Sequence, residues 1–185
     1  MILDFRKFDR RPFHSTKTGS EYFFVRADAF VPQNKTAEQI ASICGHPSVY
    51  NAIFFEAFKG KPYTSESARF FIQMIQEGWK SGAAFHFLVI PADHEVIGTV
   101  GIKSHDAGAG EIGYWTSPLH SGIASKALEM LCAEAAQAGI NSLYAYVKPN
   151  NSASIRVLEK NSFERDPHHE RKDRDVLLYR KTLAN

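Results

Sequence analysis

The sequence is poor in the features that mark secreted, membrane-spanning or thiolate-metal proteins. Among 185 residues there are only two cysteines, Cys44 and Cys132, and neither has a second cysteine at the spacing of a metal site. This scarcity argues against a disulfide framework and indicates a reducing compartment. The apolar residues at the start are interrupted by charges, and no later apolar run is long enough to cross a bilayer. We therefore expect a soluble, cytoplasmic protein.

The charges lack an excess of one sign. Twenty-two Lys and Arg residues stand against twenty Asp and Glu residues, which leaves a net charge of +2. This balance does not favour a nucleic-acid-binding protein, because such proteins attract phosphates with clustered positive charge. The 44% hydrophobic and 23% charged content is that of an ordinary globular chain, and the length suits one core. We expect a single domain spanning residues 1–185 that binds small molecules and neither nucleic acid nor membrane.

The first half of the chain shows one strand pattern followed by two helical patterns. Residues 21–28 are aromatic and β-branched, which is typical of a strand. Residues 36–44 predict a short helix capped by Thr36, and a longer helix begins at Thr64 or Ser65. The longer helix has an apolar face made of Ala68, Phe71, Ile72, Ile75 and Trp79.

The second half alternates between extended and helical periods. Three extended runs at residues 83–91, 95–103 and 109–116 have short connections and predict an antiparallel meander, with a hairpin at residues 92–94. A helix then ends at Gly139, followed by a strand, a short helix and a last strand at residues 142–148, 151–161 and 175–183. This order predicts an α/β fold. The apolar face of the helix before Gly139 consists of Ala124, Ala127, Leu128, Leu131 and Ala135.

A loop with one glycine, "PLHSGIASK", connects the third extended run to that helix. The first-turn N–H groups of a helix have no partners within the helix, and together with the helix dipole they can hold a phosphate. Gly122 would let a ligand approach the backbone closely. The loop could equally be an ordinary strand-to-helix turn, and one glycine does not decide between these interpretations.

Four segments in order, "IGTVGIK", "EIGYWTSP", "GIASKALEML" and "YAYVKPNNSASIRVLEKNSF", resemble the GNAT superfamily of acyl-CoA N-acyltransferases. The chain is most similar to the branch that contains the ribosomal-protein N-terminal alanine and serine acetyltransferases. The resemblance covers about residues 22–183 and is most specific over residues 98–163. It implies a single-domain α/β (α+β) fold, with a mixed, mostly antiparallel central sheet flanked by helices and with splayed central strands.

The resemblance implies acetyl-CoA as cosubstrate, no metal, and transfer of the acetyl group to a primary amine. The pantetheine arm would pair with main-chain groups of Tyr114, Trp115 and Thr116 between the splayed strands. Asn151 and Ser154 match positions that contact this arm near the thioester, although Asn151 could also cap the last helix. The pyrophosphate would rest on the backbone amides of Ser121, Gly122, Ile123, Ala124, Ser125 and Lys126.

The sequence departs from the family pattern in two places. The loop from Pro118 to Gly122 is shorter than usual and has no Arg or Lys before the glycine, so His120 or Lys126 would have to substitute. Ser162 stands where the family has a glycine, which should mainly affect a turn. A degenerate loop leaves two alternatives to an enzyme, a non-catalytic acyl-CoA-binding module or a protein-interaction scaffold.

Direct transfer to an amine needs a route for the amine's proton and a donor for the departing thiolate. Glu111 shares a strand face with Gly113 and Trp115 and is the candidate for the proton route, but it could instead form an ion pair with a nearby Lys or Arg. Ser154 is the hydroxyl available to the thiolate, because the tyrosine that many superfamily members use would fall near Leu158. Ser154 could also simply bond its own helix backbone.

The histidines and the acceptor region offer fewer constraints. We expect His168 and His169, beside Glu170, to lie in a solvated loop rather than to bind a metal. We expect His86 to be a histidine of the sheet whose hydrogen bonds are satisfied, rather than a catalytic base. His46 precedes a proline and favours a turn. The resemblance implies that residues 36–80 and 164–175 wall the acceptor cleft. A peptide N-terminus, a polyamine, an amino sugar or an amino acid would suit it, and a homodimer is left open.

Overall fold

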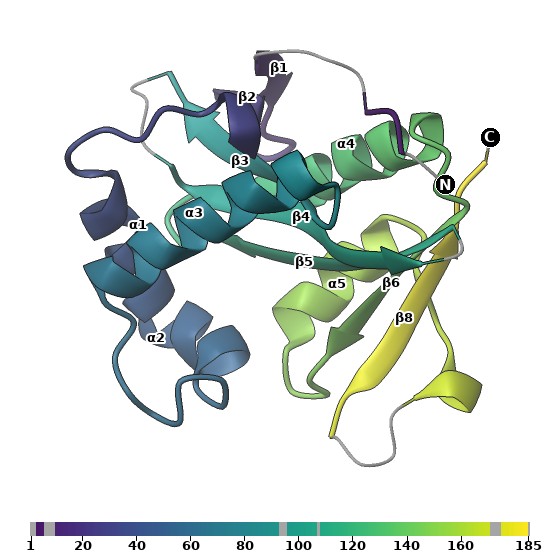
Figure 1. Cartoon of the computed structure of the whole chain (residues 1–185). Coiled ribbons are helices and arrows are strands. Elements are labelled where there is room, and N and C mark those ends of the chain that lie inside the picture. Colours follow the sequence, from purple (N-terminus) through teal and green to yellow (C-terminus); the bar gives the residue numbers. More distant parts are fainter. Residues whose placement is uncertain (1–2, 6–9, 93–95, 107, 171–174, 185) are drawn as a thin grey trace.

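The computed structural model describes residues 3–5, 10–92, 96–106, 108–170 and 175–184 (Figure 1). Within these ranges one eight-stranded sheet runs in the order β1-β2-β3-β4-β5-β6-β8-β7. Its strands are β1 (Arg10–His14), β2 (Glu21–Arg26), β3 (Phe85–Pro91), β4 (Gly98–Asp106), β5 (Ala109–Thr116), β6 (Ser142–Val147), β7 (Glu164–Arg165) and β8 (Leu177–Thr182). The α-helices are α1 (Thr36–Gly45), α2 (Pro47–Val49), α3 (Ser65–Ser81), α4 (Ile123–Gln137) and α5 (Ser152–Lys160).

The sheet is antiparallel except where β5 meets β6. These two strands run parallel and pair only through Ala109, Gly110 and Glu111, which face Ser142, Leu143 and Tyr144. Beyond that point β5 stays paired with β4, and β6 stays paired with β8. The two central strands therefore diverge, as the resemblance implied, and Figure 1 shows the opening between them.

Helices cover both faces of the sheet (Figure 1). Helix α3 lies across one face, with α1 packed against it, while α4 lies against β4 and β5 on the other face and contacts α5. The predicted apolar stripes explain this arrangement, since Ala68, Ile72 and Ile75 of α3 are buried, as are Leu128 and Leu131 of α4. The core is formed by these helix faces and by the sheet side chains beneath them.

Two predicted features of the helices can be compared directly with the structure. Thr64 caps α3, where its hydroxyl accepts the Ser67 N–H and Ser67 completes a capping box. The prediction that Thr36 caps α1 was wrong, because the capping position is Lys35 and the Thr36 hydroxyl accepts the N–H of Gln33 in the preceding turn. Within the part of the chain that the structure describes, no helix is both long and apolar enough to span a membrane.

The structure also contains elements that the sequence patterns did not predict. The sequence did not predict β1 or the two-residue strand β7, and the proposed hairpin at residues 92–94 lies largely outside the described residues. Strand β1 is short and carries two arginines and a proline, so its alternation is weak. Ser162 adopts a φ of 60°, in the left-handed region that favours glycine, so its effect falls on a turn as predicted.

Gly101 of β4 allows a close approach that any side chain would block. A Cβ atom there would lie 2.5 Å from Cδ2 of His86 and 2.8 Å from its Cα, on the neighbouring strand β3. We expect Gly101→Ala to destabilise the fold by about 2 kcal/mol, because the backbone of a central strand cannot move aside. Urea denaturation of the variant tests this.

Gly45→Ala is the matched control, because a Cβ at the end of α1 would make only an ordinary 3.9 Å contact with the Tyr63 carbonyl oxygen. This control should change the free energy of unfolding by less than about 1 kcal/mol. Equal effects of the two substitutions would contradict the packing argument.

Candidate functional site

The opening between β5 and β6 is spanned by a tyrosine. The Tyr114 hydroxyl lies 2.6 Å from Oγ of Ser154 and 3.1 Å from its carbonyl oxygen. Burial raises the pKa of Tyr114, so its hydroxyl stays protonated and can donate a hydrogen bond. Two residues that the sequence assigned to the cofactor arm, one on β5 and one on α5, are thus in direct contact.

The start of α5 holds Ser154 in place. Asn151 caps this helix, with Oδ1 accepting the Ser154 N–H at 3.1 Å, so the capping role is present. The hydroxyl of Ser154 points to Tyr114 rather than to its own helix backbone. Leu158 is fully buried in the next turn.

The start of α4 is a loop without a side-chain cap. Gly122 lies at the N-cap with a φ of 84°, a conformation that only glycine adopts readily, and no side chain of the described residues bonds the first-turn amides. Asn161 at the end of α5 is buried, and its Nδ2 donates to Oγ of Ser125 at 3.1 Å. This bond fixes the first turn of α4 relative to α5, on the two sides of the opening.

The turn between β1 and β2 docks on this loop. Ser15 donates its hydroxyl to the Ser121 carbonyl oxygen at 2.9 Å, and Thr16 donates to the Gly122 carbonyl oxygen at 3.5 Å. The stem of Lys17 covers Gly122, where a Cβ would lie 3.1 Å from the lysine Cγ. These contacts were not predicted, because they depend on β1 and on residues about a hundred positions apart.

The two predicted substitutes for a basic loop residue have other contacts. His120 places Nδ1 3.1 Å from the Tyr22 hydroxyl, and the Lys126 ammonium group lies 2.6 Å from the Glu129 carboxylate. Among the described residues, Lys17 has no carboxylate within ion-pair distance. Lys17, an exposed residue of the β1–β2 turn, can therefore provide a positive charge beside the loop that precedes α4.

Glu111 forms the ion pair that the sequence left open as an alternative. Its Oε1 lies 2.5 Å from Nζ of Lys103, and the two side chains are 20% and 49% exposed. A register irregularity between Ile102 and Ser104 accommodates Lys103 as an extra residue of β4, and the lysine stem covers Gly113. The carboxylate and the ammonium group thus form the outer edge of the face that also carries Trp115.

His86 differs from the expectation of a satisfied sheet histidine. The ring is buried in the sheet, but Nδ1 has no hydrogen-bond partner among the residues that the structure describes. Burial, and secondarily the charge of Lys103, lowers the pKa of His86 to about 4. The ring is therefore neutral near pH 7.

The other histidines considered in the sequence analysis lie in turns and contact nearby residues. His46 accepts the Ser48 N–H at the start of α2, and His169 places Nδ1 2.9 Å from the Asp166 carboxylate. His168 lies beside it in an exposed turn. In the described ranges no group of three or more His, Cys, Asp or Glu side chains is arranged to hold a metal ion.

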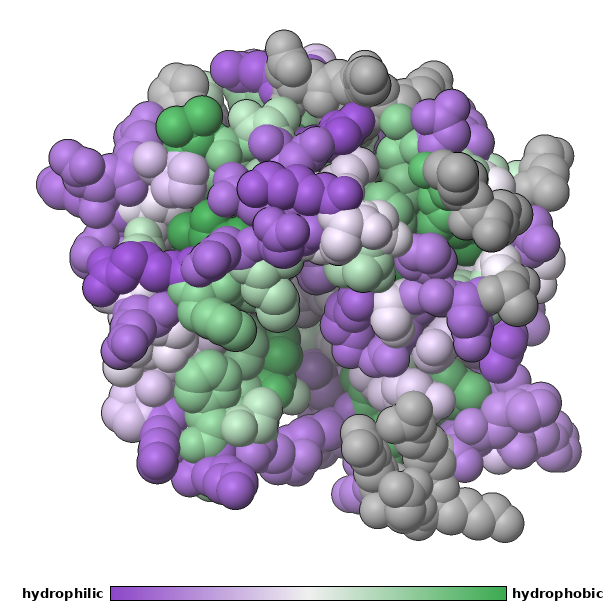
Figure 2. Space-filling model, in the orientation of Figure 1, coloured by the Kyte–Doolittle hydropathy of each residue, from purple (hydrophilic) through white to green (hydrophobic). Residues whose placement is uncertain are grey.

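The region that the sequence analysis expects to wall an acceptor cleft borders a hollow on the molecular surface, and residues 171–174 of that region lie outside the described residues. Figure 2 shows the hollow between the side formed by α1, α2 and α3 and the side formed by β6, α5 and β8. An ion pair of 2.7 Å between Glu56 and Lys148 joins the two sides. Phe55 is 51% exposed beside a packed aromatic group made of Phe54, Phe58 and Tyr63.

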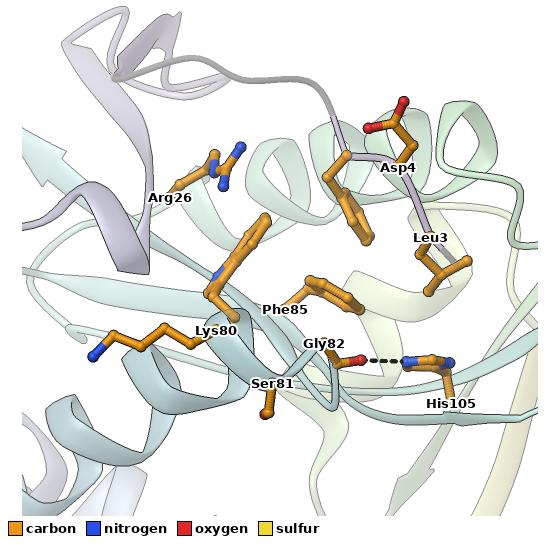
Figure 3. A pocket seen from close by; sticks show the side chains of 10 residues that line it. Leu3, Asp4, Arg26, Lys80, Ser81, Gly82, Phe85 and His105 are labelled. Carbon is orange, nitrogen blue, oxygen red and sulfur yellow. Dashed lines mark hydrogen bonds between the residues drawn. The ribbon is translucent and has the colours of Figure 1, made fainter. Parts of the chain in front are cut away.

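Two further cavities lie apart from the opening. One of about 420 Å³ (Figure 3) is lined by residues that include Leu3, Arg26, Lys80 and His105, and the His105 ring bonds the Gly82 carbonyl oxygen at 2.9 Å. The other, of about 620 Å³, lies between β1 and α4, and its lining includes Ser15, Thr16 and Lys126 near the loop before α4. Neither cavity contains a residue of the β5 edge or the start of α5.

The lowered pKa of His86 predicts a pH dependence of stability. The unfolded chain binds a proton near the ordinary pKa of 6.5, whereas the folded chain does so only near 4, so acidification across this interval favours unfolding. This shift should remove about 3 kcal/mol of stability between pH 7 and pH 4.

Urea denaturation of the wild type and of His86→Asn at both pH values measures this effect. Carboxylates with lowered pKa, such as Asp166 and Glu170, also destabilise the fold when they are protonated at low pH. This contribution should be the same in the wild type and in His86→Asn, so it cancels in the comparison. A wild type that loses no more stability than His86→Asn would contradict the assignment.

Comparisons with known proteins agree with this geometry. A family model described as "Acetyltransferase (GNAT) domain" matches residues 31–164. An uncharacterized N-acetyltransferase p20 from Bacillus licheniformis is 36% identical over 112 residues, which cover 57% of this chain and 63% of that protein. The chain thus aligns with less than two thirds of the length of this relative.

Solved structures share the fold at low sequence identity. RimJ from Mycobacterium smegmatis, in complex with CoA-disulfide, has a TM-score of 0.71 at 20% identity over 94% of this chain and 86% of that one. A ribosomal-protein-S5-alanine acetyltransferase from Vibrio fischeri has a TM-score of 0.65 at 21% identity, over 93% and 96%. Because the family model covers well over half of the sequence, this chain belongs to the GNAT acetyltransferase family.

Proposed function

We propose that this protein transfers an acetyl group from acetyl-CoA directly to a primary amine, on a protein N-terminus or a small molecule. The observation that carries this proposal is the end of β5–β6 pairing after Glu111, which leaves the β6-facing edge of β5 without a strand partner. Main-chain groups of Tyr114, Trp115 and Thr116 lie on this part of β5. We assign these groups to the pantetheine arm, and RimJ from Mycobacterium smegmatis, which shares the fold, binds a CoA disulfide.

The pyrophosphate would bind at the start of α4. The first-turn amides of residues 123–126 have no side-chain cap, and Ser121 and Gly122 offer their backbone at the same place. Lys17 would supply the positive charge that the loop itself lacks, since its stem already covers Gly122. Acetyl-CoA is then held by backbone amides and by one lysine from a distant turn, and no metal is needed.

The transfer itself is a single displacement. The neutral amine nitrogen attacks the thioester carbon, the C–N bond forms, the C–S bond breaks, and the amine nitrogen loses one proton while the thiolate gains one. Ser154 is the donor to the thiolate. When Tyr114 donates a hydrogen bond to Oγ of Ser154, the serine O–H can give its proton to the sulfur, and the serine oxygen takes a proton from solvent after the thiol leaves.

Glu111 is the residue that would receive the proton from the amine, directly or through water. Its partner Lys103 is 49% exposed and can move away from the carboxylate as the acceptor enters. The same ion pair favours a second candidate function, a non-catalytic acyl-CoA-binding module in which Glu111 has only a structural partner. We propose that residues 1–185 act as one domain in the cytoplasm.

The charge assigned to Lys17 gives a test of the cofactor site. We expect Lys17→Ala to weaken CoA binding by about tenfold, or about 1.4 kcal/mol, because an exposed charge-assisted contact to phosphate is lost. Binding of pantetheine, which has no phosphate groups, should not change. Calorimetry with both ligands measures the two affinities.

Lys80→Ala is the matched control, because Lys80 is an exposed lysine on α3 that lines a different cavity, with no residue of this loop in its lining. It should leave both affinities unchanged. If Lys17→Ala binds CoA as tightly as the wild type, Lys17 is not part of the site. If both variants bind CoA more weakly, the effect is one of overall charge and is not specific to Lys17.

Glu111→Gln distinguishes the enzyme from the binding module. We expect kcat to fall by about a hundredfold with retained affinity for acetyl-CoA, since a positioned general base contributes about this much. The assay follows thiol release with a panel of amines that includes peptides, polyamines, amino sugars and amino acids.

Lys103→Met is the companion variant, because it removes the ion pair and keeps the carboxylate. It should retain more activity than Glu111→Gln. An unchanged rate in Glu111→Gln would exclude Glu111 from proton transfer, and acetyl-CoA binding without turnover of any amine would favour the binding module.

A further inference from the structure

Lys103 places a primary amine at the carboxylate that we propose as the base. Its Nζ lies 2.5 Å from Oε1 of Glu111, and its side chain is 49% exposed. Primary amines are mostly ammonium ions near pH 7, so an acceptor must lose a proton before its nitrogen can attack a thioester. The Lys103 nitrogen already occupies the position from which Glu111 would take that proton.

A bulge in β4 directs this lysine across β5. The register shifts between Ile102 and Ser104, which makes Lys103 the extra residue of β4. Its stem then lies over Gly113, where a Cβ would be 2.9 Å from the lysine Cδ and 3.3 Å from its Cε. A side chain at position 113 would occupy the place of this stem. The glycine therefore leaves room for a lysine amine on this face of β5.

The proposed cofactor site determines where the thioester would lie. The pyrophosphate is assigned to the start of α4, which follows β5 in the chain, so the pantetheine arm runs back along β5 from Thr116 towards Tyr114. The arm cannot pass Glu111, because β6 pairs with β5 there through Tyr144. The thioester would therefore lie between Tyr114 and Glu111, a length of about 10 Å, and Gly113 is within this interval.

The two faces of β5 separate the chemical roles. Successive side chains of a strand point to opposite faces, so Gly113 opens on the face of Glu111 while Tyr114 lies on the other face. There Tyr114 contacts Ser154, the proposed donor to the thiolate. A thioester at this edge has that donor on one face and the Lys103 amine on the other. The nucleophile and the donor can then act at the same time.

We propose that the protein acetylates its own Lys103, within one chain, when acetyl-CoA is bound and no other amine occupies the site. The Lys103 ammonium group gives one proton to Glu111, Nζ attacks the thioester carbon, the C–N bond forms and the C–S bond breaks. The nitrogen releases a second proton to solvent, while the thiolate gains one from Ser154, which solvent reprotonates. The products are an acetylated lysine, the CoA thiol and one net proton. This inference rests on the proposed acetyl transfer and adds an acceptor that belongs to the chain itself.

The test incubates the purified protein with acetyl-CoA and without any added amine. Mass spectrometry of the intact chain and of its peptides then identifies the acetylated lysines. Lys103 should be acetylated about a hundredfold faster than Lys80, because only Lys103 has the base and the bound thioester beside it. Lys80 is the internal control, since its side chain is 70% exposed and its ammonium group lies 3.6 Å from the Glu77 carboxylate. Equal rates at the two lysines would indicate unassisted reaction and would overturn the proposal.

Two variants separate assisted transfer from the exposure of the lysine. Lys103→Arg keeps a cation beside Glu111 and removes the amine, so the fast acetylation should disappear. Glu111→Gln keeps the amine and removes the base, so it should slow acetylation of Lys103 by about a hundredfold. Calorimetry with acetyl-CoA checks that each variant still folds and binds. Acetylation of Lys103 at the wild-type rate in Glu111→Gln would overturn the proposal.

Dilution of the protein distinguishes transfer within one chain from transfer between chains. At saturating acetyl-CoA the first-order rate constant should not change on dilution, because the thioester and the amine are held by the same molecule. A rate constant that falls in proportion to the protein concentration would overturn transfer within the chain.

The outcomes also separate this inference from the proposed function. A protein that binds acetyl-CoA and acetylates added amines, yet leaves Lys103 unmodified, would overturn the inference and leave the proposed function intact. Fast acetylation of Lys103 that requires Glu111, in a protein that acetylates no added amine, would support the inference and contradict transfer to a separate acceptor. A protein that does not bind acetyl-CoA would contradict both.

Discussion

The structure depends on the point at which β5 and β6 stop pairing. Each strand keeps a full partner on its other side, β4 for β5 and β8 for β6, so the sheet can open between them without losing either strand. The contact of Tyr114 with Ser154 and the bond from Asn161 to Ser125 join the two sides of this opening. The backbone amides at the end of β5 and at the start of α4 are left for a ligand, because backbone polar groups require partners.

The second constraint is the arrangement of charge around the opening. The loop before α4 is short and has no basic residue of its own, yet the β1–β2 turn docks on it through Ser15 and Thr16 and lays Lys17 over Gly122. On the face of β5 that carries Trp115, Lys103 pairs with Glu111 and helps to keep His86 neutral. Charge is therefore supplied from other segments on both sides of the proposed site, and the loop itself contributes mainly backbone.

Much of the fold could be predicted from the sequence because its elements have strong periods. The apolar stripes of α3 and α4 predicted most of the side chains that these helices bury, and the aromatic and β-branched run at residues 21–28 predicted strand β2. The cap at Asn151, which the sequence offered as an alternative or addition to a cofactor contact, is present in the structure, and the cofactor contact stays a prediction. Strand β1 was missed because its pattern is weak, and with it the contact of Lys17 with Gly122. The unpartnered nitrogen of His86 depends on the register of β3 against two glycines, which no local pattern records.

The central claim, that the diverging strands and the start of α4 together bind acetyl-CoA, is tested most directly by an amide-resolved titration. Backbone amide signals would be recorded by NMR while acetyl-CoA is added to the purified protein. The account predicts saturable binding near micromolar concentration, or about −8 kcal/mol. The largest shifts should occur at residues 114–116 and 121–126. No binding at millimolar acetyl-CoA, or shifts confined to other parts of the chain, would contradict it.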